Sequence, residues 1–305
     1  MIIARFRTLL LITWGTLVFS SHAAKPTSAK AEPASPAPPQ ATAPTFAMAA
    51  PPAWVRPYAP DTTPPTNPDS DGISYLLVDV QENLGQRASY YHEAHLITSD
   101  NGVQNGAAIG ASFDPSYEKL TLHTIRILRG GQVLDRLDRS QVRLLQRERE
   151  AESFLYDGAF TAQCQLEDVR VGDVVEYAYT VEGANPVLRG HYFASFATQW
   201  SIPMRRAIVR LIRPARQPLH FLAKNRTITP AITTDHGVTE WLWDESNVPL
   251  HHGDPNPPRG YNSFGIVQFS DFADWPEVVA GSCRSIESRR PILPTSTRSL
   301  PSCAG

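Results

Sequence analysis

The sequence predicts an all-β fold, an antiparallel β-sandwich over residues 72–275. Three observations indicate this class. Short stretches rich in β-branched and aromatic residues follow one another from Ile73 onward, and turn residues separate them. No stretch between residues 73 and 270 keeps a 3.6-residue apolar period long enough for a substantial helix. About two hundred residues are ample for one core, so a single sandwich domain is expected.

Residues 1–23 have the three-part layout of a secretory signal peptide. A basic start, MIIARFR, precedes the apolar run TLLLITWGTLVF, and SHA at residues 21–23 offers a small-residue cleavage site before Ala24. The alternative is a membrane anchor, but the apolar run is short for crossing a bilayer. We therefore expect export across the inner membrane to the periplasm, with no stable membrane span after cleavage.

Residues 24–71 form a segment rich in Pro, Ala, Ser and Thr. Between residues 25 and 70 lie 13 of the 27 prolines. Such a composition lacks the apolar side chains that would offset the entropy lost on ordering. We expect a disordered, extended linker, in which the apolar island around Trp54 and Tyr58 could dock on the domain that follows.

The predicted strands follow in order along the domain. ISYLLVDV and RASYYHEAHLI come first, and the second alternates polar and aromatic side chains on its two faces. LTLHTIRIL and VLDRL form a hairpin about Gly130-Gly131, because two glycines suit a two-residue turn. FTAQCQLED and DVVEYAYTVEG flank a tight connection, VRVG. The run continues with YFASFATQWSI, RRAIVRLIRP and VTEWLWD.

Two stretches of the domain stay ambiguous. RSQVRLLQRERE comes nearest to a helical pattern, and Ser140 could cap it. The loop VPLHHGDPNPPRGYNSFG carries four prolines and three glycines between two strands. It is either an ordered crossover or a surface loop, and tertiary context must decide.

Residues 276–305 are expected to form an aborted helix and an irregular, disordered tail. Asp274 is a good helix N-cap, Pro276 suits the first turn, and Glu277 can complete a capping box. The apolar pattern stops at Gly281 after about one turn, and the remainder is rich in Ser and Arg and broken by prolines. This remainder is either a disordered tail or coding sequence in a shifted frame.

Charge and cysteine content exclude two classes of protein. The formal net charge is −2 and no basic stripe stands out, so nucleic acid is not expected as a partner. Cys164, Cys283 and Cys303 are too few for a disulfide scaffold, although Cys283 and Cys303 could pair. Cys164 alternates with Phe160, Ala162 and Leu166 on one strand face, so we expect it to be a buried apolar residue.

No catalytic residue is assigned. Cys283 would need a base to form a thiolate, but no histidine follows His252, and Glu287 is the only acid beyond the cysteine. His251-His252-Gly253-Asp254 could donate metal ligands. Adjacent histidines usually point in different directions, however, so a polar surface loop is preferred and no metal or cofactor is expected.

Acidic and aromatic residues offer three further candidate sites. Calcium could bind to the carboxylate oxygens of Glu167, Asp168 and Asp173 around Gly172. Carboxylates that cap a turn are the preferred explanation, and Asp114-Pro115 is likewise interpreted first as a turn. The strand from Tyr90 to His95 could line a ligand groove, although a half-buried strand with its polar edge in water is more usual. The third candidate is a sugar-stacking surface made of Trp241, Trp243, Tyr192 and Trp200. Paired tryptophans on a strand more often fill a sandwich core, however.

Several blocks of the sequence, in their order, resemble one family. These are SFDPSYEKLTLHTIRILRGGQVLDRLD, LYDGAFTAQCQLEDVRVGDVVEYAYTVEGANP and VQFSDFADW. The middle block is the most specific, through Leu166-Glu167-Asp168-Val169, Gly172-Asp173 and Glu176-Tyr177. Together they resemble the N-terminal domain of unknown function that precedes the transglutaminase-like domain in exported bacterial proteins, over about residues 72–275.

The resemblance implies a β-sandwich with no established catalytic residues. In the similar proteins, FADW opens a helix that leads into a papain-like domain, which supplies a Cys, a later His and a later Asp. The resemblance therefore implies that the chain is the front part of such a protein, truncated before its catalytic domain.

The expected function is that of a non-catalytic, exported interaction module, not an enzyme as given. Its expected partner is a protein or peptide, such as a transglutaminase-like catalytic domain. Two alternatives stay open: a truncated fragment of a thiol enzyme with acyl-transfer or peptidase chemistry, and a glycan-binding module.

Overall fold

The computed structural model describes residues 44–63, 72–146, 158–253, 256–258 and 261–280. The expected signal peptide, most of the linker, and Cys283 and Cys303 of the tail lie outside these residues. Among the described residues, no helix is long and apolar enough to cross a membrane.

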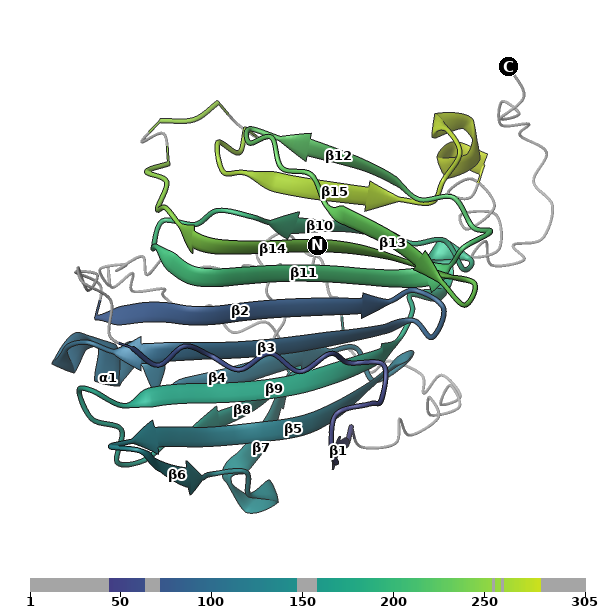
Figure 1. Cartoon of the computed structure of the whole chain (residues 1–305). Helices are drawn as coiled ribbons and strands as arrows, with labels where there is room; N and C mark the ends of the chain where they lie inside the picture. Colours follow the sequence, from purple (N-terminus) through teal and green to yellow (C-terminus); the bar gives the residue numbers. More distant parts are fainter. Residues whose placement is uncertain (1–43, 64–71, 147–157, 254–255, 259–260, 281–305) are drawn as a thin grey trace, which may run out of the picture. The chain divides into compact units, whose positions relative to one another are not determined.

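A large mixed sheet forms one layer of the domain and confirms the all-β class (Figure 1). Its strands lie in the order β1-β5-β9-β3-β2-β11-β14-β13, and β6 pairs with β5. The strands are β1 (Phe46–Met48), β2 (Ile73–Asn83), β3 (Ala88–Ile97), β5 (Glu118–Arg129), β6 (Gln132–Asp135), β9 (Val174–Gly183), β11 (Met204–Pro214), β13 (Ala231–Asp235) and β14 (Val238–Val248).

Two three-stranded sheets form the second layer. One has the order β4-β8-β7 and the other β10-β15-β12. Their strands are β4 (Ala108–Phe113), β7 (Val142–Gln146), β8 (Phe160–Gln165), β10 (Phe193–Ala197), β12 (His220–Lys224) and β15 (Ile266–Ser270).

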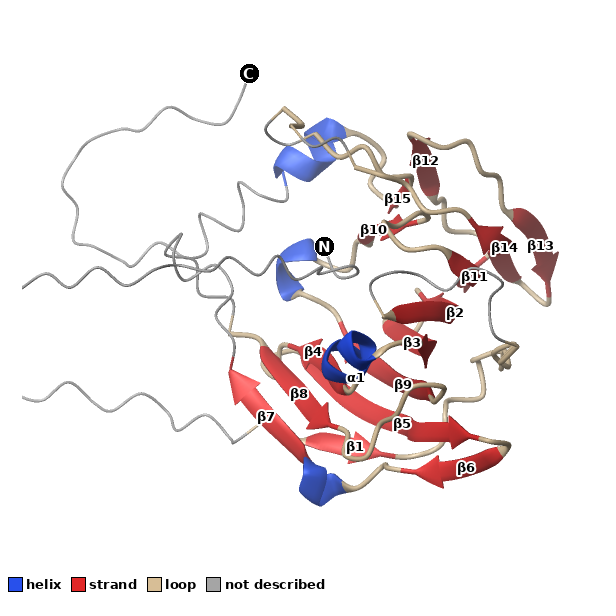
Figure 2. Cartoon of the chain, turned by 90° about the vertical axis from the view of Figure 1, so that its left-hand side faces the viewer, coloured by secondary structure: helices blue, strands red, loops and turns tan. Residues whose placement is uncertain are grey.

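Both small sheets cover the same face of the large sheet, here called the inner face. The strand register pairs Val80 with Tyr91 and Tyr91 with Tyr179, and residues paired in this way point to the same side of a sheet. Val80 packs in the core beneath β10-β15-β12, whereas Tyr179 packs against the core beneath β4-β8-β7. The expected sandwich therefore has one large layer facing two small ones (Figure 2).

Pairing within the sandwich is antiparallel with two exceptions. β2 pairs with β11 in parallel, and β1 pairs with β5 in parallel. A parallel pair needs a long connection, and β11 follows β2 only after most of the first core has been built.

The two cores follow from period-two alternation along the strands. In the first core, Ile125 and Ile127 of β5 face Ala162 and Cys164 of β8. In the second core, Phe269 of β15 contacts Phe196 and Trp243, with ring centroids 5.2 and 5.3 Å apart. Burial of each such large side chain contributes about 1.5–3 kcal/mol, so these contacts hold the layers together.

The Gly130-Gly131 hairpin is confirmed. Arg129 pairs with Gln132, and the two glycines between them have φ values of 54° and 80°. Positive φ at both central residues is what a type I′ turn requires, and glycine adopts it without steric cost.

The described part of the ambiguous stretch, residues 139–146, forms a short 3-10 turn and a strand, not an α-helix. A 3-10 turn at Arg139–Gln141 is capped by Asp138, whose side chain accepts a hydrogen bond from the Ser140 N–H, so Ser140 is not the cap. Strand β7 then presents Val142 and Leu144 to the first core at a spacing of two residues. This burial outweighs the weak helical pattern.

A short helix, α1 (Asp100–Gly106), was not expected from the sequence. The helix contains Gly102 and Gly106, and glycine weakens the helical pattern of a sequence. Glycine also permits the close contact that this helix makes. A Cβ on Gly102 would lie 1.7 Å from the Gly72 carbonyl oxygen, so only glycine permits this contact.

The structured part of the chain begins earlier than the expected boundary at residue 72. Residues 44–63, which the composition assigned to the linker, lie along the face of the large sheet opposite the inner face, here called the outer face (Figure 1). Within them β1 pairs with β5, and Phe46 joins the first core. Tyr58, from the apolar island that was expected to dock, packs against a buried cluster that includes Leu77 and Ile208. Two aromatic side chains and main-chain bonding thus order a segment that looks unstructured by composition.

The helix start at Asp274 is confirmed. Residues 275–280 are helical, Asp274 Oδ1 accepts a hydrogen bond from the Glu277 N–H at 2.9 Å, and Glu277 Oε2 accepts one from the Ala273 N–H at 2.7 Å. The caps that the sequence predicts are therefore formed, one residue removed from an ideal capping box.

Candidate functional site

The outer face carries a cluster of charged groups on four adjacent strands. His92 Nε2 lies 3.0 Å from Glu176 Oε1, and Arg126 donates two hydrogen bonds to Glu176 at 2.8 and 2.9 Å. On the other side of the imidazole, His92 Nδ1 lies 4.0 Å from Asp79 Oδ2. The strand register produces the cluster, since Asp79 pairs with His92 and Arg126 pairs with Glu176.

The two carboxyl groups of this cluster differ in their protonation. Burial raises the pKa of Asp79 to about 7, against the hydrogen bond from Gln81 and the nearby charge of His92. Burial also acts to raise the pKa of Glu176, but hydrogen bonds from His92 and Arg126 lower it below its ordinary value. Near neutral pH, Glu176 is therefore a carboxylate while Asp79 is partly protonated.

A second set of polar groups extends the cluster across β2, β11 and β14. Gln81 Nε2 donates to Asp79 Oδ2 at 2.9 Å, and Arg210 donates to Gln81 Oε1 at 3.0 Å. Arg210 also donates to Glu240 at 2.7 Å, and Glu240 forms an ion pair with Arg56 at 2.8 Å. The polar groups of the outer face thus form one connected network.

The inner face holds a separate buried group around Glu93. Tyr91 and Tyr177 donate their hydroxyl protons to Glu93 Oε2 at 2.5 and 3.0 Å, and His95 Nδ1 lies 3.0 Å from Glu93 Oε1. Burial alone would raise the pKa of Glu93, but these hydrogen bonds lower it below its ordinary value. Glu93 is therefore a buried, fully partnered carboxylate.

Both ring nitrogens of His95 have partners. Its Nε2 lies 3.0 Å from the Gly106 carbonyl oxygen, and its Nδ1 lies 3.0 Å from Glu93 Oε1. His95 and Glu93 are therefore a hydrogen-bonded pair inside the protein.

The strand from Tyr90 to His95 is more deeply buried than expected. It lies between β2 and β9 in the middle of the sheet, and its histidines and Glu93 are buried. The expectation of a half-buried strand with a polar edge in water is wrong, because covering layers lie over both faces. The strand's polar side chains bond to one another instead of to water.

Cys164 is buried in the first core, as the alternation in β8 predicts. It is 2% exposed, and burial raises the pKa of its thiol. A catalytic thiol needs the opposite shift, toward the thiolate. The thiol chemistry considered at Cys283 falls outside the described residues.

In the His251-His252 loop, the first histidine packs against the domain and the second is exposed. The His251 N–H donates to the Trp200 carbonyl at 2.7 Å, and its ring lies edge-on to Phe264. His252 is exposed, and Asp254 lies outside the described residues. Within the described part of the chain, no group of three or more His, Cys, Asp or Glu side chains could hold a metal ion.

The acidic residues around Gly172 cap a turn and form ion pairs with arginine side chains. Asp173 Oδ2 accepts a hydrogen bond from the Arg170 N–H at 2.8 Å, which is the expected turn cap. Arg129, which the sequence did not single out, pairs with Asp168 at 2.9 Å and with Asp173 at 2.8 Å. These carboxylates therefore bond to arginines of their own chain.

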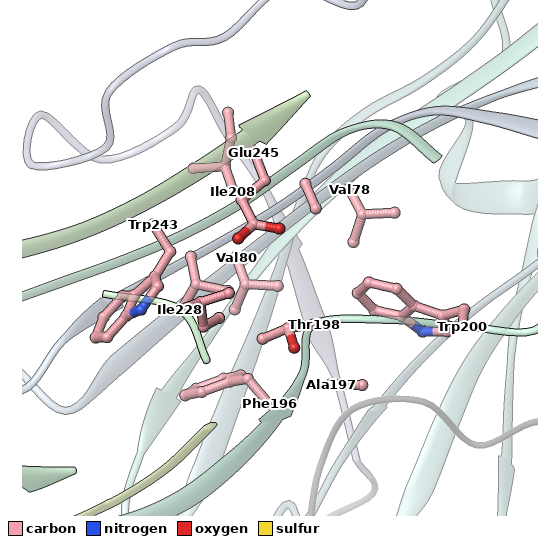
Figure 3. Close-up of a pocket in the computed structure, with 12 residues that line it drawn as sticks. Val78, Val80, Phe196, Ala197, Thr198, Trp200, Ile208, Ile228, Trp243 and Glu245 are labelled. Carbon is pink, nitrogen blue, oxygen red and sulfur yellow. The ribbon is translucent and has the colours of Figure 1, made fainter. Parts of the chain in front are cut away.

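Trp241 and Trp243 fill the second core, being 8% and 4% exposed. Their planes are covered by the β10-β15-β12 sheet and do not present stacking surfaces for a sugar. Beside Trp243 lies a small cavity of about 20 Å³, which also contacts Trp200, Thr198 and Glu245 (Figure 3). Its volume is suited to a water molecule and not to an organic ligand.

One buried hydroxyl beside this cavity gives a testable expectation. Thr198 Oγ1 is buried with no hydrogen-bond partner among the protein groups of the described part of the chain, so Thr198→Val should change the free energy of unfolding by less than about 1 kcal/mol. Thr161→Val is the matched control, because Thr161 Oγ1 lies 2.9 Å from Ser112 Oγ and its loss should lower stability. Urea denaturation of both variants would measure this, and equal losses would contradict the expectation.

A third set of charges, the exit cluster of His191, Arg213, Asp271 and Glu277, lies where the chain leaves the second core. Asp271 accepts hydrogen bonds from the Tyr192 N–H at 2.8 Å and from Arg213 at 2.9 Å. His191 Nδ1 lies 3.2 Å from Asp271, and its Nε2 lies 3.6 Å from Glu277 in the helical turn. The cluster ties the start of the helix to the sandwich.

Sequence reasoning missed most of these partners. Asp79, Glu93 and Glu176 stand inside apolar or aromatic strand sequences, where a charge is unusual, and that was the available signal. Asp271 and Arg213 are 58 residues apart, and no local pattern links them.

The family model DUF3857, a domain of unknown function with a solved structure, matches residues 84–251. No curated protein matches the sequence.

Solved structures give a likeness of fold. A proposed protease from Parabacteroides distasonis superposes with a TM-score of 0.63 and 12% identity, over 72% of this chain and 44% of that one. An M1 zinc metallopeptidase from Deinococcus radiodurans has a TM-score of 0.32 and 11% identity, over 65% of this chain and 42% of that one, which supports no inference. The chain thus spans less than half the length of these proteins.

Proposed function

The chain belongs to the DUF3857 family, and from this premise we propose that it is a non-catalytic, exported interaction module, the front part of a transglutaminase-like protein. Its role is to hold a catalytic domain that follows residue 280.

The observation that carries the proposal is the anchored helix start. The exit cluster and a stacked contact between His191 and Phe272, with ring centroids 4.2 Å apart, fix the position from which the helix leaves the sandwich. Beyond this anchor, Trp275 is 79% exposed and Val279 is 55% exposed. A fixed exit with exposed apolar side chains fits a module that presents a docking surface to its neighbour.

Two further points support the proposal. The match covers 44% of the protease whose fold the chain resembles, so that protein has further chain beyond the shared fold. The described cysteine, Cys164, is a core residue with a raised thiol pKa, so it does not offer a nucleophilic thiol.

Co-purification tests the proposal. The DNA that follows codon 280, translated in three frames, should encode a domain with a Cys, a later His and a later Asp. Expressed as a separate chain, that domain should bind this one, and Trp275→Ala should weaken binding at least tenfold, as loss of an interface tryptophan usually does. Exposed Asp235 supplies the control, since Asp235→Ala should leave binding unchanged.

Activity of the chain alone would contradict the proposal. Amine incorporation and peptide hydrolysis should be undetectable, and Cys283→Ala should change neither folding nor binding. Rapid alkylation of Cys283 by iodoacetamide well below neutral pH would indicate an activated thiolate and a true thiol enzyme.

A further inference from the structure

Residues 44–63 lie on the outer face in the manner of a bound peptide. The segment runs as an extended chain in front of the large sheet (Figure 1). Within it, Phe46 is the one buried side chain, while most of the others are exposed. The attachment must therefore come largely from the main chain.

The first attachment lies at β5. The Ala49 N–H donates to the Leu122 carbonyl at 3.2 Å, and His123 Nδ1 donates to the Ala49 carbonyl at 2.8 Å. Arg139 donates to the Phe46 carbonyl. Two side chains and one strand edge thus bind main-chain groups of the segment.

The second attachment lies at β2 and β11. The Gln81 side chain accepts from the Arg56 N–H at 2.9 Å and donates to the Arg56 carbonyl at 2.6 Å, as a neighbouring strand would. Arg210 donates to the Trp54 carbonyl at 2.9 Å. Six main-chain groups of the segment are therefore bound by the sheet, and such contacts do not depend on the bound sequence.

Side chains add selectivity at two points. Phe46 is 7% exposed, and the Arg139 guanidinium carbon lies 4.4 Å from its ring centroid. Ten residues later, Arg56 donates two hydrogen bonds to Glu240, at 2.9 and 2.8 Å. The face thus selects an aromatic residue followed by a basic one.

The groups that bind the segment are held in place by the sheet itself. Gln81 is oriented by Asp79, and Arg210 by Glu240. Beneath the segment the outer face carries charged groups, including His92 and Glu176, beside a buried apolar cluster against which Tyr58 packs. Phe46 fills a place in the first core. Removal of the segment would expose both apolar places, so an incoming polypeptide must cover them as the segment does.

We propose that the outer face is a binding track for extended polypeptides, and that residues 44–63 are an internal occupant displaced by a polypeptide of another protein. The ligand is a chain with an aromatic residue at the Phe46 position and arginine at the Arg56 position. A tethered occupant has an effective concentration of about millimolar, so only a better-matched or locally concentrated polypeptide displaces it. This site is independent of the exit cluster and of the function proposed above.

An exchange experiment on the full chain tests the track. A site for a sequence-specific protease is introduced between residues 63 and 72, the chain is cut, and a fluorescent synthetic peptide of residues 44–63 is added. Fluorescence anisotropy should show saturable binding to the cut chain, and binding to the uncut chain at least a hundredfold weaker because its own segment competes. Peptides with Phe46→Ala or Arg56→Ala should bind at least tenfold more weakly, and the exposed-residue control Met48→Ala should bind unchanged.

Three outcomes would overturn the proposal. The cut chain could lose its cooperative unfolding transition, which would make the segment part of the fold. The peptide could fail to exchange with a folded, cut chain. Light scattering could show a dimer that persists without peptide binding, which would mean that a second copy of this chain occupies the track. Binding through Trp275 would be unaffected by any of these results.

Discussion

Replacing Glu93 by alanine is expected to lower the free energy of unfolding by about 3–5 kcal/mol. The change would leave Nδ1 of His95 without its partner and the hydroxyl groups of Tyr91 and Tyr177 without an acceptor. All of these groups lie inside the sandwich, where unpaired polar groups are costly. Urea denaturation followed by tyrosine and tryptophan fluorescence would measure the loss.

Two variants make this result specific. Glu93→Gln keeps the shape but removes the charge, so it should cost less than alanine. Glu182→Ala removes an exposed carboxylate at the end of β9 and should change stability by less than about 0.5 kcal/mol. A loss for Glu93→Ala no larger than that of Glu182→Ala would mean that the buried hydrogen-bonded group contributes little.

Asp79→Asn is expected to make the domain more stable than the wild type at alkaline pH. In the folded protein burial raises the pKa of Asp79 to about 7 from an ordinary value of 3.8. Between these values the folded chain binds more protons than the unfolded chain, so stability falls as pH rises. The contribution of Asp79 is present below about pH 4 and lost as pH rises through about 7, a change of up to about 4 kcal/mol.

Measuring the free energy of unfolding at pH 4, 6 and 8 would test the direction of this change. The stability of Asp79→Asn relative to the wild type should rise across that series, and exposed Asp235→Asn should track the wild type at each pH. The free energy of unfolding of Asp79→Asn should still fall somewhat as pH rises, because burial also raises the pKa of Glu82 to about 8. Parallel curves for Asp79→Asn and the wild type would show that Asp79 is ionised in the folded protein.

Local patterns predicted the features whose causes are local. The alternation that buries Cys164 in β8, the Gly130-Gly131 turn and the caps at Asp274 each depend on a few neighbouring residues. Hydrophobic alternation also predicted that Trp241 and Trp243 would fill the core. In each case the backbone geometry of one element was enough to orient the side chain.

The candidate sites depend on strands that are distant in the chain. His92 meets Glu176 because β3 and β9 are neighbours, and Arg210 meets Gln81 because β11 pairs with β2 in parallel. No spacing within one strand encodes these contacts. The deep burial of β3 likewise depends on layers formed by other parts of the chain.

By itself, the sequence determined the all-β class, the alternation of most strands and the position of the helix start at Asp274. Strand order, the parallel pairs and the attachment of residues 44–63 to the outer face were decided by the tertiary structure alone. The reason is physical: side-chain alternation and capping arise from neighbouring residues. The position of a strand in a sheet depends instead on the free energy of all its long-range contacts together. A proline-rich segment that cannot order itself is therefore held through its main-chain groups by side chains that only the assembled sheet brings together.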